Sequence, residues 1–145
     1  MAVTRREMRG LTPHEVFDVL RDGFTYGDWV VGTRTIRAVD QDWPAVGSRL
    51  HYTVGYGPMR HDDETASLRY EPDRELELEA HAWPAGTAHI RITAERIDVG
   101  TRVEIDEKPH RGPAKLLHNP LLDMLIKARN VETLRRLEAK AAGRR

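Results

Sequence analysis

A long stretch of alternating apolar and charged residues constrains this fold more than any other feature of the sequence. In residues 74–83, RELELEAHAW, Leu76 and Leu78 fall on one face, and Glu75 and Glu77 fall on the other. Such period-two alternation is typical of a strand with one buried and one solvated face. The alternation runs from residue 33 to residue 107 and is interrupted by short turns rich in Pro and Gly.

Six strands are expected in this region. Their connections are short, so consecutive strands should pair as an antiparallel meander. Residues 3–8, VTRREM, are expected to add one more strand at an edge. The expected inward residues are Ala66, Leu68 and Tyr70 in residues 64–71, Leu76, Leu78, Ala80 and Ala82 in residues 74–83, and Ala88, Ile90, Ile92 and Ala94 in residues 87–97.

Two short helices are predicted between the edge strand and the meander. Residues 11–20, LTPHEVFDVL, begin with Thr12 as the N-cap, Pro13 at the first helical position and Glu15 completing a capping box. The buried side of this helix is Val16, Phe17, Val19 and Leu20. The next segment, TYGDWVVG, has room for a single helical turn.

A long helix is predicted at the C-terminal end, with Asn119 as its cap and Pro120 at its first position. A sheet with one dry face and one long helix can bury both apolar surfaces by curling around the helix. The expected fold is therefore α+β and forms one domain over residues 1–145. Its curved antiparallel sheet of six to seven strands wraps around the C-terminal helix, with two short helices after the first strand.

Polar residues interrupt the apolar stripe of this last helix. Steps of three and four residues define one face, which consists of Leu122, Ile126, Arg129, Asn130, Thr133, Leu134, Leu137 and Ala141. A helix that docks on a dry core keeps this face apolar. A guanidinium and an amide in its middle therefore need another explanation.

The inward face of the sheet carries little side-chain volume. Alanine is depleted in strands, where branched residues normally pack, yet five alanines fall on this face: Ala66, Ala80, Ala82, Ala88 and Ala94. Either the helix approaches the sheet closely or the space is a cavity lined by aromatic residues. Those aromatics are Trp29, Tyr52, Tyr56, Tyr70 and Trp83. Because buried tyrosine hydroxyls need polar partners, we interpret Arg129 and Asn130 as lining a part-polar cavity.

Glu107 is the one acidic residue expected to face inward, in step with Val103 and Ile105. The alternative is a solvated strand end, because Pro109 follows two residues later. A buried carboxylate without a cation is costly, so an inward Glu107 should pair with Arg129. Glu107, Arg129 and Asn130 therefore join the five aromatics as predicted ligand-binding residues.

Patterns for several kinds of catalytic site are missing. There is no cysteine, which excludes thiolate metal sites and cysteine nucleophiles. Neither HExxH nor His-x-His spacing occurs, so we expect no metal site and no cofactor. His51, His81 and His89 fall on the solvated face of the sheet, and His61 falls in a turn. Phosphate-binding glycine loops and a serine nucleophile elbow are also missing.

The charge balance argues against nucleic acid as a partner. Lys plus Arg and Asp plus Glu number 23 each among 145 residues, which gives a net charge of zero. The N-terminus is charged and unlike a signal peptide, and no apolar run is long enough to span a bilayer. We therefore expect a cytoplasmic protein without stable membrane insertion, whose oligomeric state the sequence leaves open.

Five stretches carry a family resemblance: TPHEVFDVLRDGFTYGDWVVG, WPAVGSRLHYTVGYGP, AWPAG, GTRVEIDE and RNVETLRRL, within residues 12–137. They resemble the START and birch-pollen-allergen-like (SRPBCC) superfamily, and in particular its bacterial polyketide cyclase/dehydrase-like branch. The resemblance implies a helix-grip fold with a cavity between the sheet and the C-terminal helix. Members bind sterols, lipids, polyketides, plant hormones or quinones, and some cyclise or aromatise. No catalytic signature transfers to these residues.

Three functions are compatible with these observations. The first is binding of a small, mostly apolar, ring-containing ligand, which Arg129, Asn130 and Glu107 would orient. The second is an aromatase/cyclase acting on a poly-β-keto chain, in which Arg129 polarises a carbonyl while Glu107 or His61 moves protons. The third is a protein-interaction or lipid-delivery module. The sequence identifies neither the ligand nor a catalytic residue.

Overall fold

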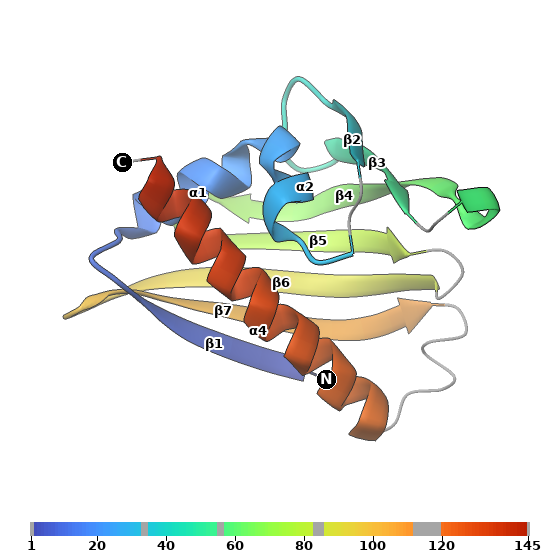
Figure 1. Cartoon of the computed structure of the whole chain (residues 1–145). Helices are drawn as coiled ribbons and strands as arrows, with labels where there is room; N and C mark the ends of the chain where they lie inside the picture. The colour runs from blue at the N-terminus through green and yellow to red at the C-terminus, as the bar shows by residue number, and fades with distance from the viewer. Residues whose placement is uncertain (1, 33–34, 55–56, 83–85, 112–119, 145) are drawn as a thin grey trace.

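The structure is a computed structural model that describes residues 2–32, 35–54, 57–82, 86–111 and 120–144 (Figure 1). Its strands are β1 (Ala2–Arg9), β2 (Thr35–Val39), β3 (Arg49–Val54), β4 (His61–Glu71), β5 (Glu75–Ala82), β6 (Gly86–Ile97) and β7 (Gly100–Arg111). Its helices are α1 (Pro13–Arg21), α2 (Tyr26–Trp29) and α4 (Pro120–Gly143), and two 3-10 turns span Gly23–Thr25 and Gly57–Met59.

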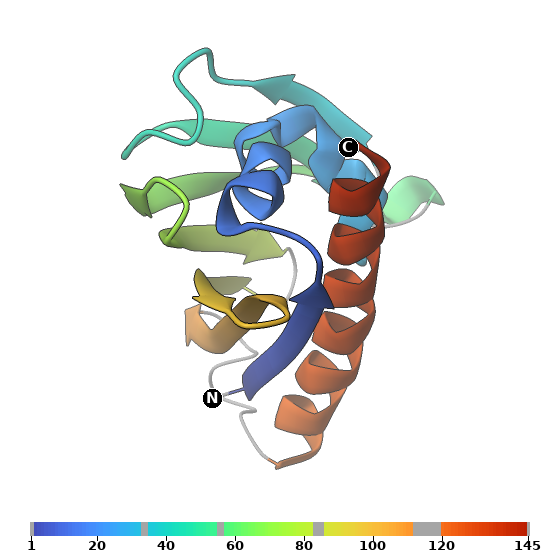
Figure 2. The same cartoon turned by 90° about the vertical axis from the view of Figure 1, so that its left-hand side faces the viewer.

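The seven strands form one antiparallel sheet in the order β1-β7-β6-β5-β4-β3-β2. Strands β2 to β7 make the expected meander, and β1 is the expected edge strand beside β7. The sheet curves around α4, which crosses its concave face (Figures 1 and 2). The α+β helix-grip architecture expected from the sequence is therefore confirmed. The expected cap Asn119 lies outside the described residues.

Helix α1 begins as its sequence predicts. Thr12 accepts a hydrogen bond from the Glu15 backbone amide through its hydroxyl, and Glu15 accepts one from the Thr12 amide. This reciprocal capping box satisfies two amides that have no partner within the helix. The four residues expected on the buried side, Val16, Phe17, Val19 and Leu20, are all fully buried.

A fully buried part of the core lies where α1 and the C-terminal half of α4 meet the sheet. Figure 2 shows α1 on the same side of the sheet as α4, close to the C-terminal end of α4. The large apolar residues there are at most 1% exposed: Phe17, Leu20, Leu76, Leu134 and Leu137. This end of the molecule contains the continuous apolar stripe that a docked helix requires.

The alternation expected for β7 is confirmed, because Val103, Ile105 and Glu107 are all buried. The prediction for β4 is wrong by one residue. Thr65 and Ser67 are the buried residues of that strand, whereas Leu68 is 42% exposed. An irregularity in the pairing with β5 between Ser67 and Arg69 shifts the register, and such a bulge changes which residues face inward.

Among the helices that the structure describes, none is long and apolar enough to cross a membrane.

Candidate ligand-binding site

A cavity of about 400 Å³ lies between the concave face of the sheet and α4. Its volume is within the range of small-molecule sites in proteins. The apolar part of its lining comes from α2, from strands β2, β3, β5 and β6 and from the N-terminal half of α4. It includes Trp29, Ile36, Leu50, Leu78, Ala80, Ala88, Ile90, Leu122 and Ile126. The helix stripe and the sheet alanines thus meet across the same space.

Two of the five alanines explain why this space is not filled. Ala80 and Ala88 lie directly opposite each other on β5 and β6 and line the cavity. Ala94 is buried in the packed core instead, and Ala66 takes the outward register position on β4, between buried Thr65 and Ser67. The side chain of Ala82 lies outside the described residues. Of the two alternatives predicted from the sequence, the structure therefore has a cavity beside Ala80 and Ala88, and not a close approach of helix and sheet.

The polar part of the wall is a cluster of three residues on β7 and α4. Arg129 donates a hydrogen bond through its guanidinium to Glu107 Oε1, and Asn130 donates one to the same oxygen at 3.2 Å. Glu107 is only 5% exposed and Asn130 only 3% exposed. The pairing expected between Glu107 and Arg129 is present, and it explains the polar interruption of the helix stripe.

This cluster leaves hydrogen-bonding capacity toward the cavity. Both contacts to Glu107 use Oε1, and within the described part of the chain no hydrogen bond reaches its Oε2. A carboxylate oxygen accepts hydrogen bonds only, whereas a guanidinium only donates. The wall therefore offers a buried acceptor beside a donor, and the side chain of Arg129 is 38% exposed.

The polar atoms of the lining aromatics are already bonded within the protein. Tyr52 donates its hydroxyl proton to the His81 carbonyl at 2.7 Å and lies 2.8 Å from the Thr65 hydroxyl. Trp29 donates its indole N–H to the Thr25 hydroxyl at 3.1 Å. Burial raises the pKa of Tyr52 to about 12, so this phenol stays protonated at neutral pH. These residues therefore present apolar surface to the cavity.

Not every predicted site residue lies at this cavity. Trp29, Tyr52, Glu107, Arg129 and Asn130 line it. Tyr70 is not among the residues that line the cavity. It faces inward as predicted, but it does so at the packed end, where its ring stacks on Phe17 and its hydroxyl accepts a hydrogen bond from Arg21. Two further predictions, Tyr56 and Trp83, lie outside the described residues.

Several lining residues escaped the sequence-based prediction, among them Tyr26, Ile36 and Thr65. Tyr26 and Ile36 come from short elements with too few residues to show a period, and Thr65 was hidden by the β4 bulge. His61, the alternative proton carrier, is exposed at the start of β4 and is not among the residues that line the cavity. Of the two residues predicted to move protons, Glu107 and His61, Glu107 is the one that lines the cavity.

No protein-family model matches the chain, and no curated protein matches it. Several solved structures share its fold. Protein MLL2253 from Mesorhizobium loti aligns with a TM-score of 0.70 and 17% identity over 99% of this chain and 96% of its own. Ara h 8.0201 aligns with a TM-score of 0.71 and 10% identity over 97% of each chain.

The di-domain ARO/CYC StfQ from the steffimycin biosynthetic pathway aligns with a TM-score of 0.70 and 9% identity. The alignment covers 99% of this chain and 52% of StfQ. At these identities the likenesses show the fold alone. The chain has the fold of the birch-pollen-allergen-like and polyketide cyclase-like proteins, as its resemblance implied.

Proposed function

We propose that this protein binds a small, mostly apolar, ring-containing ligand of the polyketide, lipid or sterol kind in the cavity between sheet and α4. One observation carries the proposal: the described walls of the cavity are mostly apolar, and they contain a buried polar cluster formed by Glu107, Arg129 and Asn130. Small-molecule sites combine these two features, with apolar walls for contact area and a few polar groups for orientation.

The cluster favours a particular polar group on the ligand. Oε2 of Glu107 accepts a hydrogen bond, so it suits a phenol, an enol or another hydroxyl. Arg129 suits a carbonyl or carboxylate oxygen next to that hydroxyl. The hydrogen-bond donors of the lining tyrosines and tryptophan are bonded within the protein. They therefore do not compete with the cluster in orienting the ligand. A ring system with one oxygenated edge fits these demands.

A second candidate function is a polyketide aromatase/cyclase, and the pairing of a base with a cation favours it. In an aldol cyclisation, Glu107 would take an α-proton while Arg129 polarises the carbonyl that is attacked. The new carbon–carbon bond forms as the carbonyl π-electrons move to oxygen, which then receives the proton. The likeness to the ARO/CYC protein StfQ supports this candidate at the level of the fold.

Native mass spectrometry of the full chain, purified without added ligand, tests the binding proposal. We expect a fraction of the protein to carry a small molecule, which is then identified after denaturation. The variant Ala88→Leu fills part of the cavity, so we expect it to be purified without the small molecule. An equal load on the Ala88→Leu variant would place the small molecule elsewhere and contradict the proposal.

A separate assay distinguishes the cyclase from the carrier. The purified protein is incubated with a poly-β-ketone analogue, and the products are followed by chromatography. Catalysis predicts ring-closed product whose formation is lost in Glu107→Gln while the analogue still binds. Binding without any change in product distribution supports the carrier function.

A further inference from the structure

Three residues with metal-binding side chains come together on the outer face of the sheet, away from the cavity. Glu79 on β5 lies directly opposite His89 on β6. His110 on β7 is placed beside them by a shift in the β6–β7 register between Thr87 and Ala88. Lys108, opposite His89 in the register, is exposed. No spacing rule in the sequence could reveal this set, because it spans three strands.

The geometry of the set suits a cation. His89 Nε2 lies 3.2 Å from Glu79 Oε2, and the rings of His89 and His110 stack with their centroids 3.8 Å apart. One candidate donor atom from each of the three residues lies within 4.8 Å of the others. The two rings are inclined by only 19°, and an imidazole lone pair lies in the plane of its ring. Metal–ligand bonds of about 2.0–2.2 Å therefore require the two rings to turn out of their stack so that the donor atoms converge on the cation.

We propose that Glu79, His89 and His110 form a surface site for a divalent cation of the zinc class. Two imidazoles and one carboxylate are the donors that Zn²⁺, Ni²⁺ and Cu²⁺ accept readily, whereas Mg²⁺ and Ca²⁺ require mainly oxygen donors. Three protein donors leave a fourth position for water, as in open zinc sites.

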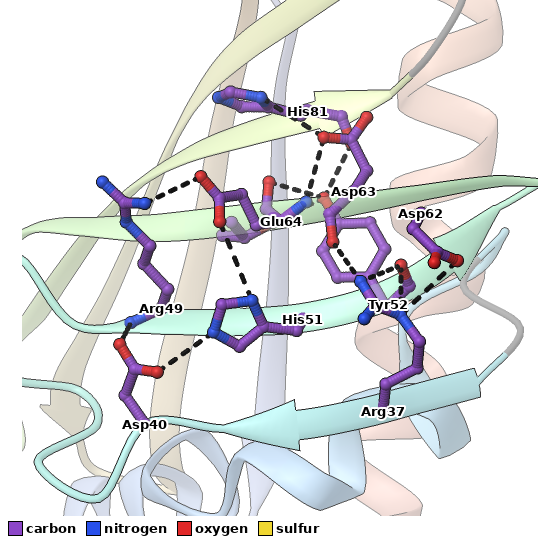
Figure 3. Close-up of polar contacts among 10 residues, drawn as sticks. Arg37, Asp40, Arg49, His51, Tyr52, Asp62, Asp63, Glu64 and His81 are labelled. Atoms are coloured by element: carbon purple, nitrogen blue, oxygen red, sulfur yellow. Dashed lines mark hydrogen bonds and ion pairs between the residues drawn. The ribbon is translucent and has the colours of Figure 1, made fainter.

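A second layer of contacts orients the carboxylate. His81 Nε2 lies 3.4 Å from Glu79 Oε1. His81 Nδ1 lies 3.3 Å from Asp63 Oδ1 (Figure 3). Outer partners of this kind fix the orientation of a metal ligand.

A nearby histidine on the same face supplies a matched comparison. His51 lies between two carboxylates, with Nε2 at 3.0 Å from Asp40 and Nδ1 at 3.7 Å from Glu64 (Figure 3). That group has one imidazole and is an ordinary ion-pair cluster. The side chain of His51 is 28% exposed and that of His89 is 33% exposed. Both lie in the same sheet, so His51→Gln controls for nonspecific effects of removing a surface histidine.

A cation at this site would link three strands whose inner residues form the cavity wall. Ala80 follows Glu79, Ala88 precedes His89 and Pro109 precedes His110, and all three line the cavity. Binding to the folded state alone raises the unfolding temperature with metal concentration. We therefore expect added metal to raise the unfolding temperature and a chelator to reverse this increase.

The test uses the full chain without any histidine tag, titrated with Zn²⁺ by calorimetry and with Co²⁺ by visible absorption. We expect one equivalent to bind, with affinity falling on acidification as protons compete for the imidazoles. His89→Gln and His110→Gln should each weaken binding more than tenfold, and His81→Gln should weaken it by about tenfold. His51→Gln should bind as the unaltered protein does.

Far-ultraviolet circular dichroism of each metal-free variant checks that it is folded, and Glu79→Gln replaces any variant that is not. Binding that survives in both His89→Gln and His110→Gln overturns the proposal. A total lack of saturable Zn²⁺ or Co²⁺ binding also overturns it, as does an equal loss in His51→Gln. These measurements do not depend on a ligand in the cavity. A negative result would therefore contradict the metal site and leave the proposed ligand-binding function untouched.

Discussion

The two halves of α4 face the same sheet but meet very different surroundings. Toward the C-terminus, Leu134, Leu137 and Ala141 are at most 1% exposed and pack against α1 and the sheet. Toward the N-terminus, the same stripe continues as Leu122, Ile126 and Arg129 and borders the cavity. One helix thus closes a core at one end and roofs a cavity at the other.

The difference arises from residue volume and polarity on both partners. At the packed end the sheet offers Leu76 and α1 offers Phe17. At the cavity end the sheet offers Ala80 and Ala88, and the helix offers a guanidinium. Since protein interiors are normally filled to crystal-like density, leaving this volume open at one end is a local property of a few residues. Substitutions at matched positions therefore test it.

The largest expected effect is from truncation at the packed end. Leu137→Ala should lower the free energy of unfolding by about 2–5 kcal/mol, because it opens a cavity where neighbours cannot collapse. Ile126→Ala, on the same stripe at the cavity end, should cost about 1 kcal/mol or less, since its side chain is only half-buried. Urea denaturation measures both, and equal costs would contradict the distinction between the two ends.

The next largest change in the free energy of unfolding is expected from substitutions in the polar cluster of Glu107, Arg129 and Asn130. Arg129→Met leaves the buried Glu107 carboxylate with only Asn130 and should cost about 1–3 kcal/mol. The full cost of breaking a dry ion pair is about 3–5 kcal/mol, and the 38% exposure of Arg129 reduces it. The double variant with Glu107→Gln should recover much of the loss. Strict additivity in the double-mutant cycle would show that the pair is not coupled.

A smaller contrast is expected between two alanines on one strand. Ala94→Leu overfills the packed core and should destabilise by about 1–3 kcal/mol. Ala88→Leu extends into open space and should change the free energy of unfolding by less than about 1 kcal/mol. Thermal unfolding compares the two variants. Equal destabilisation would indicate that the space beside Ala88 is filled.

The smallest effect concerns the polar network at the packed end, where Arg21 contacts Asp73 at 3.0 Å and His14 contacts it at 3.2 Å. Although burial opposes it, hydrogen bonds from Arg21 and His14 lower the pKa of Asp73 below its ordinary 3.8. A carboxyl whose pKa is lower in the folded than in the unfolded protein stabilises the fold at any pH above its unfolded pKa. This stabilisation is lost as the pH falls through the pKa of the folded protein.

Asp73→Asn should therefore cost at most about 1 kcal/mol at neutral pH, as for partly exposed ion pairs. Asparagine tolerates the left-handed backbone at this position, where φ is 63°. The difference from the unaltered protein should shrink below pH 3.8. A difference that stays constant down to that pH and below would exclude the carboxylate as its cause.

Regular alternation made much of this fold predictable. The strand containing Leu76 and Leu78 and the inward Glu107 followed from period two, and the capping box at Thr12 marked the start of α1. Ala66 and Leu68 were assigned to the wrong face because the bulge in β4 has no glycine or proline to signal it. Tyr70 faces inward as predicted but lies at the packed end, and period two does not tell which end of a strand meets a cavity. The approach of His89 to His110 depends on strand register, which local sequence does not determine.

The most direct test of the central claim, an apolar cavity at the N-terminal half of α4, is fluorescence titration with the polycyclic probe 1-aminoanthracene. We expect saturable binding of one probe per chain, lost in Ala88→Leu and retained in Ala66→Leu, which alters the outer face of the same sheet. Probe binding that is unchanged in Ala88→Leu, or absent from the unaltered protein, would contradict the cavity.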